Sequence, residues 1–186
     1  MSLPDAPAHG VRVRRAPGVR RGDPGPRDRR ERRGRGGGTM TIDVSAERVI
    51  PLPPEQVARY AMDWRHDPDW TQGIRTAELT RETDAGGFGV GAEVTRTAYF
   101  LGRRIDYVMR VAACHYPRLL DMVSVAGPMP MHVTYAFDPH PDGTLARIRV
   151  RGAGGGFHRL AAPLLARQVR SSIGKDLRDL ERRLTE

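Results

Sequence analysis

The chain has 186 residues and a formal net charge of +9 at pH 7, but this charge is unevenly spread. Residues 1–39 hold 11 Arg, 8 Gly, 5 Pro and only 4 acidic residues, a net charge of +7, which leaves about +2 for residues 40–186. The composition therefore does not indicate a basic folded surface. No apolar run approaches the roughly 18 residues of a membrane-spanning helix. The single cysteine, Cys114, excludes an intrachain disulfide and fits a reducing, cytoplasmic compartment.

Residues 1–39 are expected to form a disordered tail, because too few large apolar side chains are present to offset the entropy of ordering it. The stretch RRERRGRGGG resembles arginine-glycine segments that bind RNA through charge. We therefore expect any nucleic-acid binding to be non-specific and confined to the tail. The chain has 30 Arg, one Lys and no Asn, which indicates a very GC-rich bacterial gene. Translation from an upstream start, with Met40 as the true start, is an open alternative.

Residues 40–186 are expected to form one domain. Alternating apolar and polar residues predict a first strand over Thr41–Ile50, and two short helices follow, the second over 64–72. After a strand over 74–82, turns containing Gly or Pro separate five short segments at nearly regular intervals, which is typical of an antiparallel meander. These strands are predicted at 94–100, 103–114, 118–126, 130–138 and 144–152. A long amphipathic helix is predicted over 157–184.

The predicted strands have one apolar and one solvated face. Over 131–138, Met131, Val133, Tyr135 and Phe137 alternate with polar or small residues. Such a sheet is covered on one side only. A curved sheet followed by one long helix can enclose an apolar cavity, so the sequence points to binding of a hydrophobic molecule more than to a particular reaction.

Seven stretches occur in the order PLPPEQV, DWRHDPDWTQGI, GVGAEV, LGRRIDY, YPRLL, YAFDPHPDGT and KDLRDLERRL. In this order they resemble motifs of the START-like (SRPBCC) superfamily, and within it the polyketide cyclase/dehydrase and lipid-transport group. The resemblance covers residues 41–186. It implies an α+β helix-grip fold, in which a seven-stranded curved antiparallel sheet wraps around the C-terminal helix, with two short helices after the first strand. It implies a cavity between sheet and helix, but no single activity, because the group's members differ in ligand.

We expect the domain to bind a small hydrophobic molecule, such as a lipid, a polyketide or an aromatic metabolite, in this cavity. The candidate wall residues are apolar or aromatic, and each would also suit ordinary core packing. They are Trp70, Tyr107, Met109, Met131, Tyr135, Phe137, Leu160, Leu164 and Ile173.

The alternative is an enzyme, a polyketide aromatase/cyclase or dehydrase. The resemblance implies that buried polar side chains would then orient a reactive chain and shuttle protons. The catalytic candidates are Arg96, Tyr99, His132 and His158. Alternation turns Arg96 inward, whereas His132 shares the solvated face with Thr134. The sequence leaves open whether a reaction is catalysed: a buried acid–base pair would favour an enzyme, and an all-apolar cavity would favour a carrier or sensor.

No cofactor or metal site is expected. The GAGGG stretch at 152–156 lacks the Lys-Ser/Thr of a phosphate-binding loop. The segment His66-Asp67-Pro68-Asp69 matches no standard ligand spacing and is interpreted as a capped, solvated turn. The expected partner is a small hydrophobic molecule; the sequence determines neither its identity nor the oligomeric state.

Overall fold

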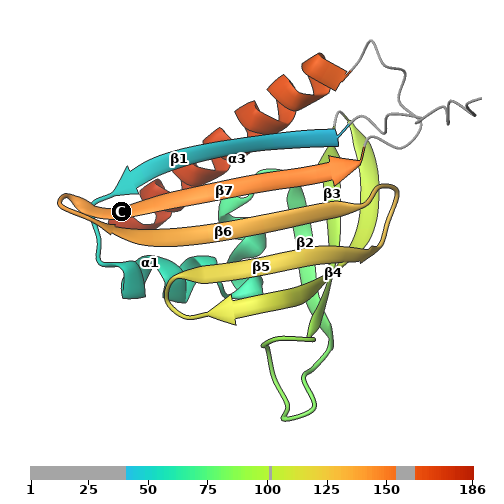
Figure 1. Cartoon of the computed structure of the whole chain (residues 1–186), viewed down its shortest axis with the longest axis horizontal. Coiled ribbons are helices and arrows are strands. Elements are labelled where there is room, and N and C mark those ends of the chain that lie inside the picture. Colours follow the sequence, from blue (N-terminus) through green and yellow to red (C-terminus); the bar gives the residue numbers. More distant parts are fainter. Residues whose placement is uncertain (1–40, 101, 154–161) are drawn as a thin grey trace, which may run out of the picture. The chain divides into compact units, whose positions relative to one another are not determined.

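The computed structural model describes residues 41–100, 102–153 and 162–186, so the predicted tail lies outside the described residues. Within these ranges the fold is α+β, as predicted, and each predicted strand is present. The elements are β1 (Thr41–Ile50), α1 (Pro54–Ala61), the 3-10 helix η1 (Trp64–His66), α2 (Asp67–Trp70), β2 (Ile74–Arg81), β3 (Glu93–Phe100), β4 (Arg103–His115), β5 (Leu119–Ala126), β6 (Met131–His140), β7 (Gly143–Ala153) and α3 (Ala162–Thr185) (Figure 1).

The strands of the described residues form one antiparallel sheet in the order β1-β7-β6-β5-β4-β3-β2. Strands β2 to β7 each pair with the next along the chain, which is the predicted meander. Strand β1 pairs with β7, so β1 and β2 lie at opposite edges although they are consecutive. The connection through α1, η1 and α2 therefore crosses one face of the sheet, and α3 packs on this face, mainly against β1 (Figure 1).

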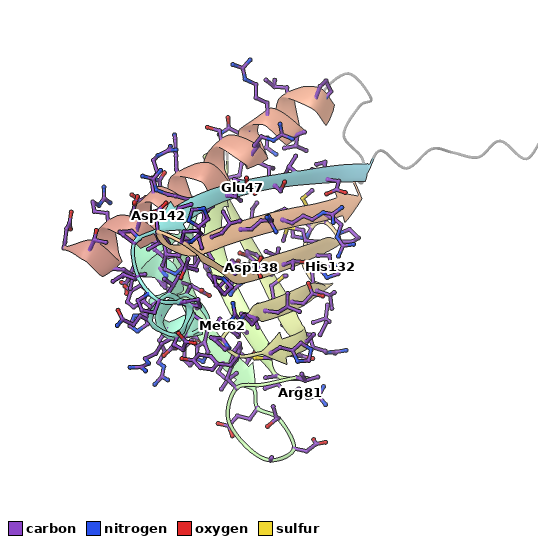
Figure 2. The ribbon with its side chains drawn as sticks, turned by 60° about the vertical axis from the view of Figure 1, so that its left-hand side comes forward. Glu47, Met62, Arg81, His132, Asp138 and Asp142 are labelled. Carbon is purple, nitrogen blue, oxygen red and sulfur yellow. The ribbon has the colours of Figure 1, made fainter. Side chains whose placement is uncertain are left out.

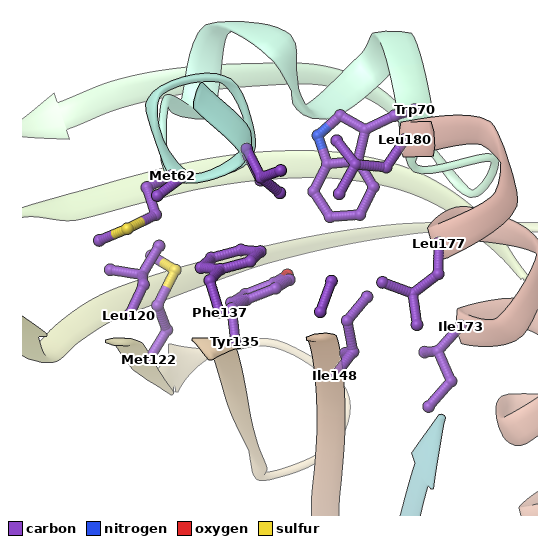
Figure 3. Packing of buried hydrophobic residues seen from close by; sticks show 14 of the residues in the cluster. Met62, Trp70, Leu120, Met122, Tyr135, Phe137, Ile148, Ile173, Leu177 and Leu180 are labelled. Carbon is purple, nitrogen blue, oxygen red and sulfur yellow. The ribbon is translucent and has the colours of Figure 1, made fainter. Parts of the chain in front are cut away.

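Alternation along the strands separates the core from the outer face. In β7, Ala146 and Ile148 are buried, whereas Arg149 points outward and pairs with Asp43 of β1 at 2.6 Å. The inward residues of the sheet meet those of the helices in one core, which contains Met62, Trp70, Leu120, Met122, Tyr135, Phe137, Ile148, Ile173, Leu177 and Leu180 (Figure 3). Each fully buried side chain of this size stabilises the fold by about 1.5–3 kcal/mol. This arrangement is the predicted helix-grip fold.

Helix ends differ from the predicted ones for local reasons. The helix predicted over 64–72 is split into η1 and α2, because Pro68 lacks an N–H and starts a new helix rather than continuing one. The described part of the last helix begins at Ala162. Residues 157–161, predicted as the start of this helix, lie outside the described residues. None of the helices in the described ranges is long and apolar enough to cross a membrane.

A turn at Pro141-Asp142 joins β6 to β7, and Gly143 is the first residue of β7. Gly143 has a φ of +130°, a conformation that side-chain-bearing residues rarely adopt, and a Cβ at this position would collide with the carbonyl oxygen of Ile50. Thr144, the next residue, donates a hydrogen bond from Oγ1 to the carbonyl of Leu52 at 2.6 Å. The turn thus holds the start of α1 close to the sheet.

Candidate functional site

A cavity of about 200 Å³ lies between the concave face of the sheet and α3. Its walls come from β1, α2 and the loop after it, strands β2 to β4, the β5–β6 turn, β6, β7 and the inner face of α3. Six of the expected wall residues line it: Trp70, Tyr107, Met109, Met131, Tyr135 and Ile173. The strand residues among them face the cavity because they alternate with outward residues, and Ile173 faces it because of its position on the inner side of α3.

Two expected wall residues that the structure describes are not in the lining, and a third is not described. Phe137 is buried in the core and is absent from the described lining. Leu164 is 70% exposed, because the inner stripe of α3 begins one residue later, at Leu165, and continues through Val169. The prediction for Leu164 is therefore wrong. Leu160 lies outside the described residues.

A buried ion pair lies at one side of the cavity. Arg96 of β3 and Asp67 of α2 are each 3% exposed, with Arg96 Nη2 at 2.6 Å and Nε at 2.8 Å from Asp67 Oδ2. Burial raises the pKa of the Asp67 carboxyl, an effect that the Arg96 charge opposes. The pKa of Arg96 is raised despite burial, because Asp67 stabilises its charge. Alternation predicted that Arg96 faces inward, but the interpretation of Asp67 as part of a solvated turn is wrong.

Two tyrosines and a tryptophan stand near this ion pair. Burial raises the pKa values of Tyr107 and Tyr135, and the Arg96 charge partly offsets both shifts. Both phenols therefore stay protonated at neutral pH and are available as donors. The Trp70 ring meets the Tyr135 ring edge-on at a centroid distance of 6.1 Å. The buried Trp70 Nε1 has no hydrogen-bond acceptor among the described residues.

Asp176 is the polar wall residue that the sequence analysis missed. It lies on α3, is 5% exposed, and accepts a hydrogen bond from the backbone N–H of Gln72 at 3.0 Å. Burial raises the pKa of its carboxyl to about 7; the Gln72 bond opposes the shift and nearby Asp179 adds to it. A signal was present in the sequence, since an aspartate interrupts the apolar stripe of Ile173, Leu177 and Leu180.

Two other catalytic candidates, Tyr99 and His132, are described, and neither enters the cavity as an acid–base group. Tyr99 borders the rim and is 48% exposed. His132 lies on β6 (Figure 2), where its Nε2 donates to Asp121 Oδ2 at 2.6 Å and its Nδ1 accepts from Arg151 Nη2 at 2.8 Å. His158 lies outside the described residues. Among the described residues, no group of three His, Cys, Asp or Glu is placed to hold a metal ion.

The model of the family described as polyketide cyclase/dehydrase and lipid transport matches residues 41–185. The chain belongs to this family. The sequence resemblance is thereby confirmed for the whole folded region. A comparison with proteins of curated function found no match to this family member.

Solved structures share the helix-grip fold of this polyketide cyclase/dehydrase family member. A protein from Thermus thermophilus has a TM-score of 0.66 and 21% identity, covering 76% of this chain and 96% of that one. The Zhui aromatase/cyclase from a Streptomyces species has a TM-score of 0.65 and 12% identity, with 77% and 93% covered. A START superfamily protein from Mycobacterium smegmatis has a TM-score of 0.64 and 13% identity, with 77% and 96% covered. At these identities the likeness shows the fold alone.

In this member of the family, the cavity combines apolar walls with a few polar groups. Arg96 and Asp67 neutralise each other, Tyr107 and Tyr135 are neutral donors, and Asp176 changes its charge near neutral pH. Such a site can surround an apolar molecule and orient one polar group on it. It can also exchange one proton with that molecule, through Asp176.

Proposed function

We propose that this domain binds a small, mostly apolar molecule bearing one polar group in the cavity between the sheet and α3. The observation that carries the proposal is the cavity itself, a space of about 200 Å³ with mainly apolar walls and convergent polar side chains. An apolar protein cavity of about 150 Å³ is enough to hold benzene, whereas sites for drug-sized ligands occupy roughly 300–1,000 Å³. One or two rings, or a short alkyl chain, fit the space; an extended polyketide or a long lipid would have to protrude from it.

The polar groups favour a ligand with a hydroxyl or carbonyl. The Tyr107 and Tyr135 phenols line the cavity and stay protonated, so each can donate to a ligand oxygen. Protonated Asp176 can donate to a carbonyl, and the Asp176 carboxylate can accept from a hydroxyl. Binding would then give the Asp176 carboxyl a hydrogen bond to the ligand in addition to the one from the Gln72 N–H.

Filling the cavity is expected to abolish binding. Met109 is fully buried in β4 and lines the cavity, so Met109→Trp places a larger ring in the ligand's space. We expect the affinity for the neutral apolar probe N-phenyl-1-naphthylamine, measured by its fluorescence, to fall at least about tenfold. Val108→Trp is the matched control, because the neighbouring side chain points to the outer face and is expected to leave binding intact. Unchanged binding by Met109→Trp, with Val108→Trp also unchanged, would locate the probe elsewhere.

A second candidate function is proton transfer to or from a carbonyl compound, as in an aromatase/cyclase or dehydrase. The observation that favours it is Asp176, a buried carboxyl whose pKa of about 7 suits a general acid or base at neutral pH. A buried acid–base pair was expected to favour an enzyme, and Asp176 would be the member of such a pair whose pKa desolvation shifts. Arg96 cannot act as a free cation, because Asp67 holds it, so its part would be to orient Asp67 and the tyrosines near it.

Proton transfer predicts faster exchange of the α C–H protons of a small cyclic ketone with D₂O in the presence of the protein, followed by NMR. The rate is expected to rise as the pH increases through about 7, because the Asp176 carboxylate is then the base. Asp176→Asn should abolish this enhancement, and Asp138→Asn, on the exposed outer face of β6, should retain it. Equal exchange with Asp176→Asn and the unaltered protein would remove Asp176 from the reaction.

A further inference from the structure

A second hollow, of about 530 Å³, lies on the outer face of the sheet at the ends of β2, β3 and β4. We call it the outer groove. It is lined by Arg75, Thr76, Thr97, Tyr99 and Arg104. The two guanidinium groups, the Thr76 hydroxyl and the Tyr99 phenol are donors suited to an anion, whereas the Thr97 hydroxyl already donates to Asp106 Oδ1 at 2.7 Å.

The outer groove and the cavity are built from the same strand ends. Side chains alternate between the two faces of a sheet, so neighbouring residues contribute to opposite hollows. The residues that line the cavity are Ile74, Ala98 and Ile105, and their neighbours in the outer groove are Arg75, Thr97 and Arg104. Tyr99 belongs to both linings, and its backbone N–H donates to the carbonyl of Gly73 at 2.7 Å. A ligand that extends past Tyr99 therefore leaves the cavity beside the outer groove.

The arginines of the groove are free to take an anion. The guanidinium of Arg75 lies 6.0 Å from the centre of the Tyr99 ring, and no carboxylate of the described residues is within ion-pair distance of it. Arg104 contacts Asp106 at 3.2 Å, but both side chains are more than half exposed. Such surface pairs contribute about 0–1 kcal/mol, so a phosphate or carboxylate can compete for Arg104. A guanidinium binds either group through two parallel hydrogen bonds.

The cavity itself does not suit an anion. Among the described lining residues its one cation is Arg96, which Asp67 already neutralises, and Asp176 would repel a negative charge once ionised. A molecule with an apolar body and an anionic end would therefore place the body inside and the end outside. Two arginines in the described linings of the cavity and the groove lack a buried partner. They are Arg75 and Arg104, and both lie in the outer groove.

We propose that the ligand is an amphiphile whose apolar part occupies the cavity and whose anionic group, a phosphate or carboxylate, binds between Arg75 and Arg104 in the outer groove. This inference rests on the proposed binding function and specifies its ligand class. A short alkyl chain with a terminal phosphate has this chemistry, and the same chain with a terminal hydroxyl lacks only the anion.

The test compares 1-decanol with decyl phosphate on the full chain, through displacement of N-phenyl-1-naphthylamine. Decyl phosphate is expected to bind at least about tenfold more tightly. The double variant Arg75→Gln/Arg104→Gln should reduce its affinity to that of 1-decanol and leave 1-decanol unchanged. Arg110→Gln is the control, since Arg110 is also exposed on β4, six residues from Arg104, and its loss should change neither affinity.

Retention of the phosphate preference by the double variant would overturn the groove proposal, while binding of 1-decanol would still support the cavity. If neither ligand displaced the probe and Met109→Trp had no effect, the proposed function itself would fail. Inorganic phosphate is expected to compete with decyl phosphate only at much higher concentration. Competition at equal concentration would overturn the amphiphile proposal, because the groove would then be a site for free phosphate.

Discussion

Replacing Asp176 with asparagine is expected to stabilise the folded protein at pH 8 and to have little effect on stability near pH 4. The pKa of the carboxyl is 3.8 in the unfolded reference and about 7 when folded, because burial disfavours its charge. The folded state therefore binds this proton more tightly, and stability falls as the pH rises from about 4 to about 7. The shift corresponds to on the order of 4 kcal/mol at most. Asparagine stays neutral, so it does not incur this loss, and its side-chain oxygen can still accept the Gln72 N–H.

The measurement is the free energy of unfolding in urea at several pH values for the unaltered protein and for Asp176→Asn. The two curves should meet at low pH and separate above it, with the variant more stable. Asp138→Asn is a suitable control, because Asp138 is an exposed carboxylate on the outer face of β6 and is not among the groups that shift the pKa of Asp176. A variant that is less stable at pH 8 would show that the buried carboxylate is stabilised in the folded protein, and the pKa shift would then be wrong.

The loss of folding stability that the Asp176 carboxyl causes is relevant to its function. A carboxyl on an otherwise apolar wall weakens the fold at neutral pH, and the same position filled by asparagine or leucine would not. Residues that lower stability in this way are common where a site needs a particular chemistry. Stability gained together with loss of ligand binding or proton exchange in Asp176→Asn would link the carboxyl to the proposed function.

The sheet and the long helix could be predicted because their patterns are local. Alternation over 131–138 and 144–152 needs only one buried face, and the turn at Gly143 needs only the residues beside it. The order of motifs then gave the helix-grip topology, which no single strand specifies. These are features in which neighbouring residues carry the information.

The polar side of the cavity could not be predicted in this way. Asp67 and Arg96 are 29 residues apart, and their pairing depends on how α2 lies on the sheet. The charged segment around Asp67 looks solvated because three of its four residues are polar and its burial is decided by tertiary packing. Tyr135 and Phe137 share one face of β6, yet only Tyr135 is in the described lining, because the helices cover each differently. Burial that depends on distant elements leaves little signal in the local sequence.

Breaking the Arg96–Asp67 pair is expected to destabilise the protein strongly. Both side chains are almost completely buried, so Arg96→Met leaves the Asp67 carboxylate without its partner in an apolar site. Loss of one member of a buried pair costs about 3–5 kcal/mol, and we expect Arg96→Met to lower the free energy of unfolding by about this amount at pH 7. Asp67→Asn should be similarly damaging, because it leaves the Arg96 guanidinium uncompensated.

The double variant Asp67→Asn/Arg96→Met is expected to be more stable than Arg96→Met alone, since it removes both charges together. A double-mutant cycle in urea measures this coupling directly. The exposed pair of Arg104 and Asp106, at the adjoining end of β4, is the matched control, and its cycle should give a coupling below about 1 kcal/mol. If the buried pair coupled no more strongly than the exposed one, water would have to reach Arg96. The exclusion of anions from the cavity depends on a dry, neutralised wall, and that premise would then be refuted.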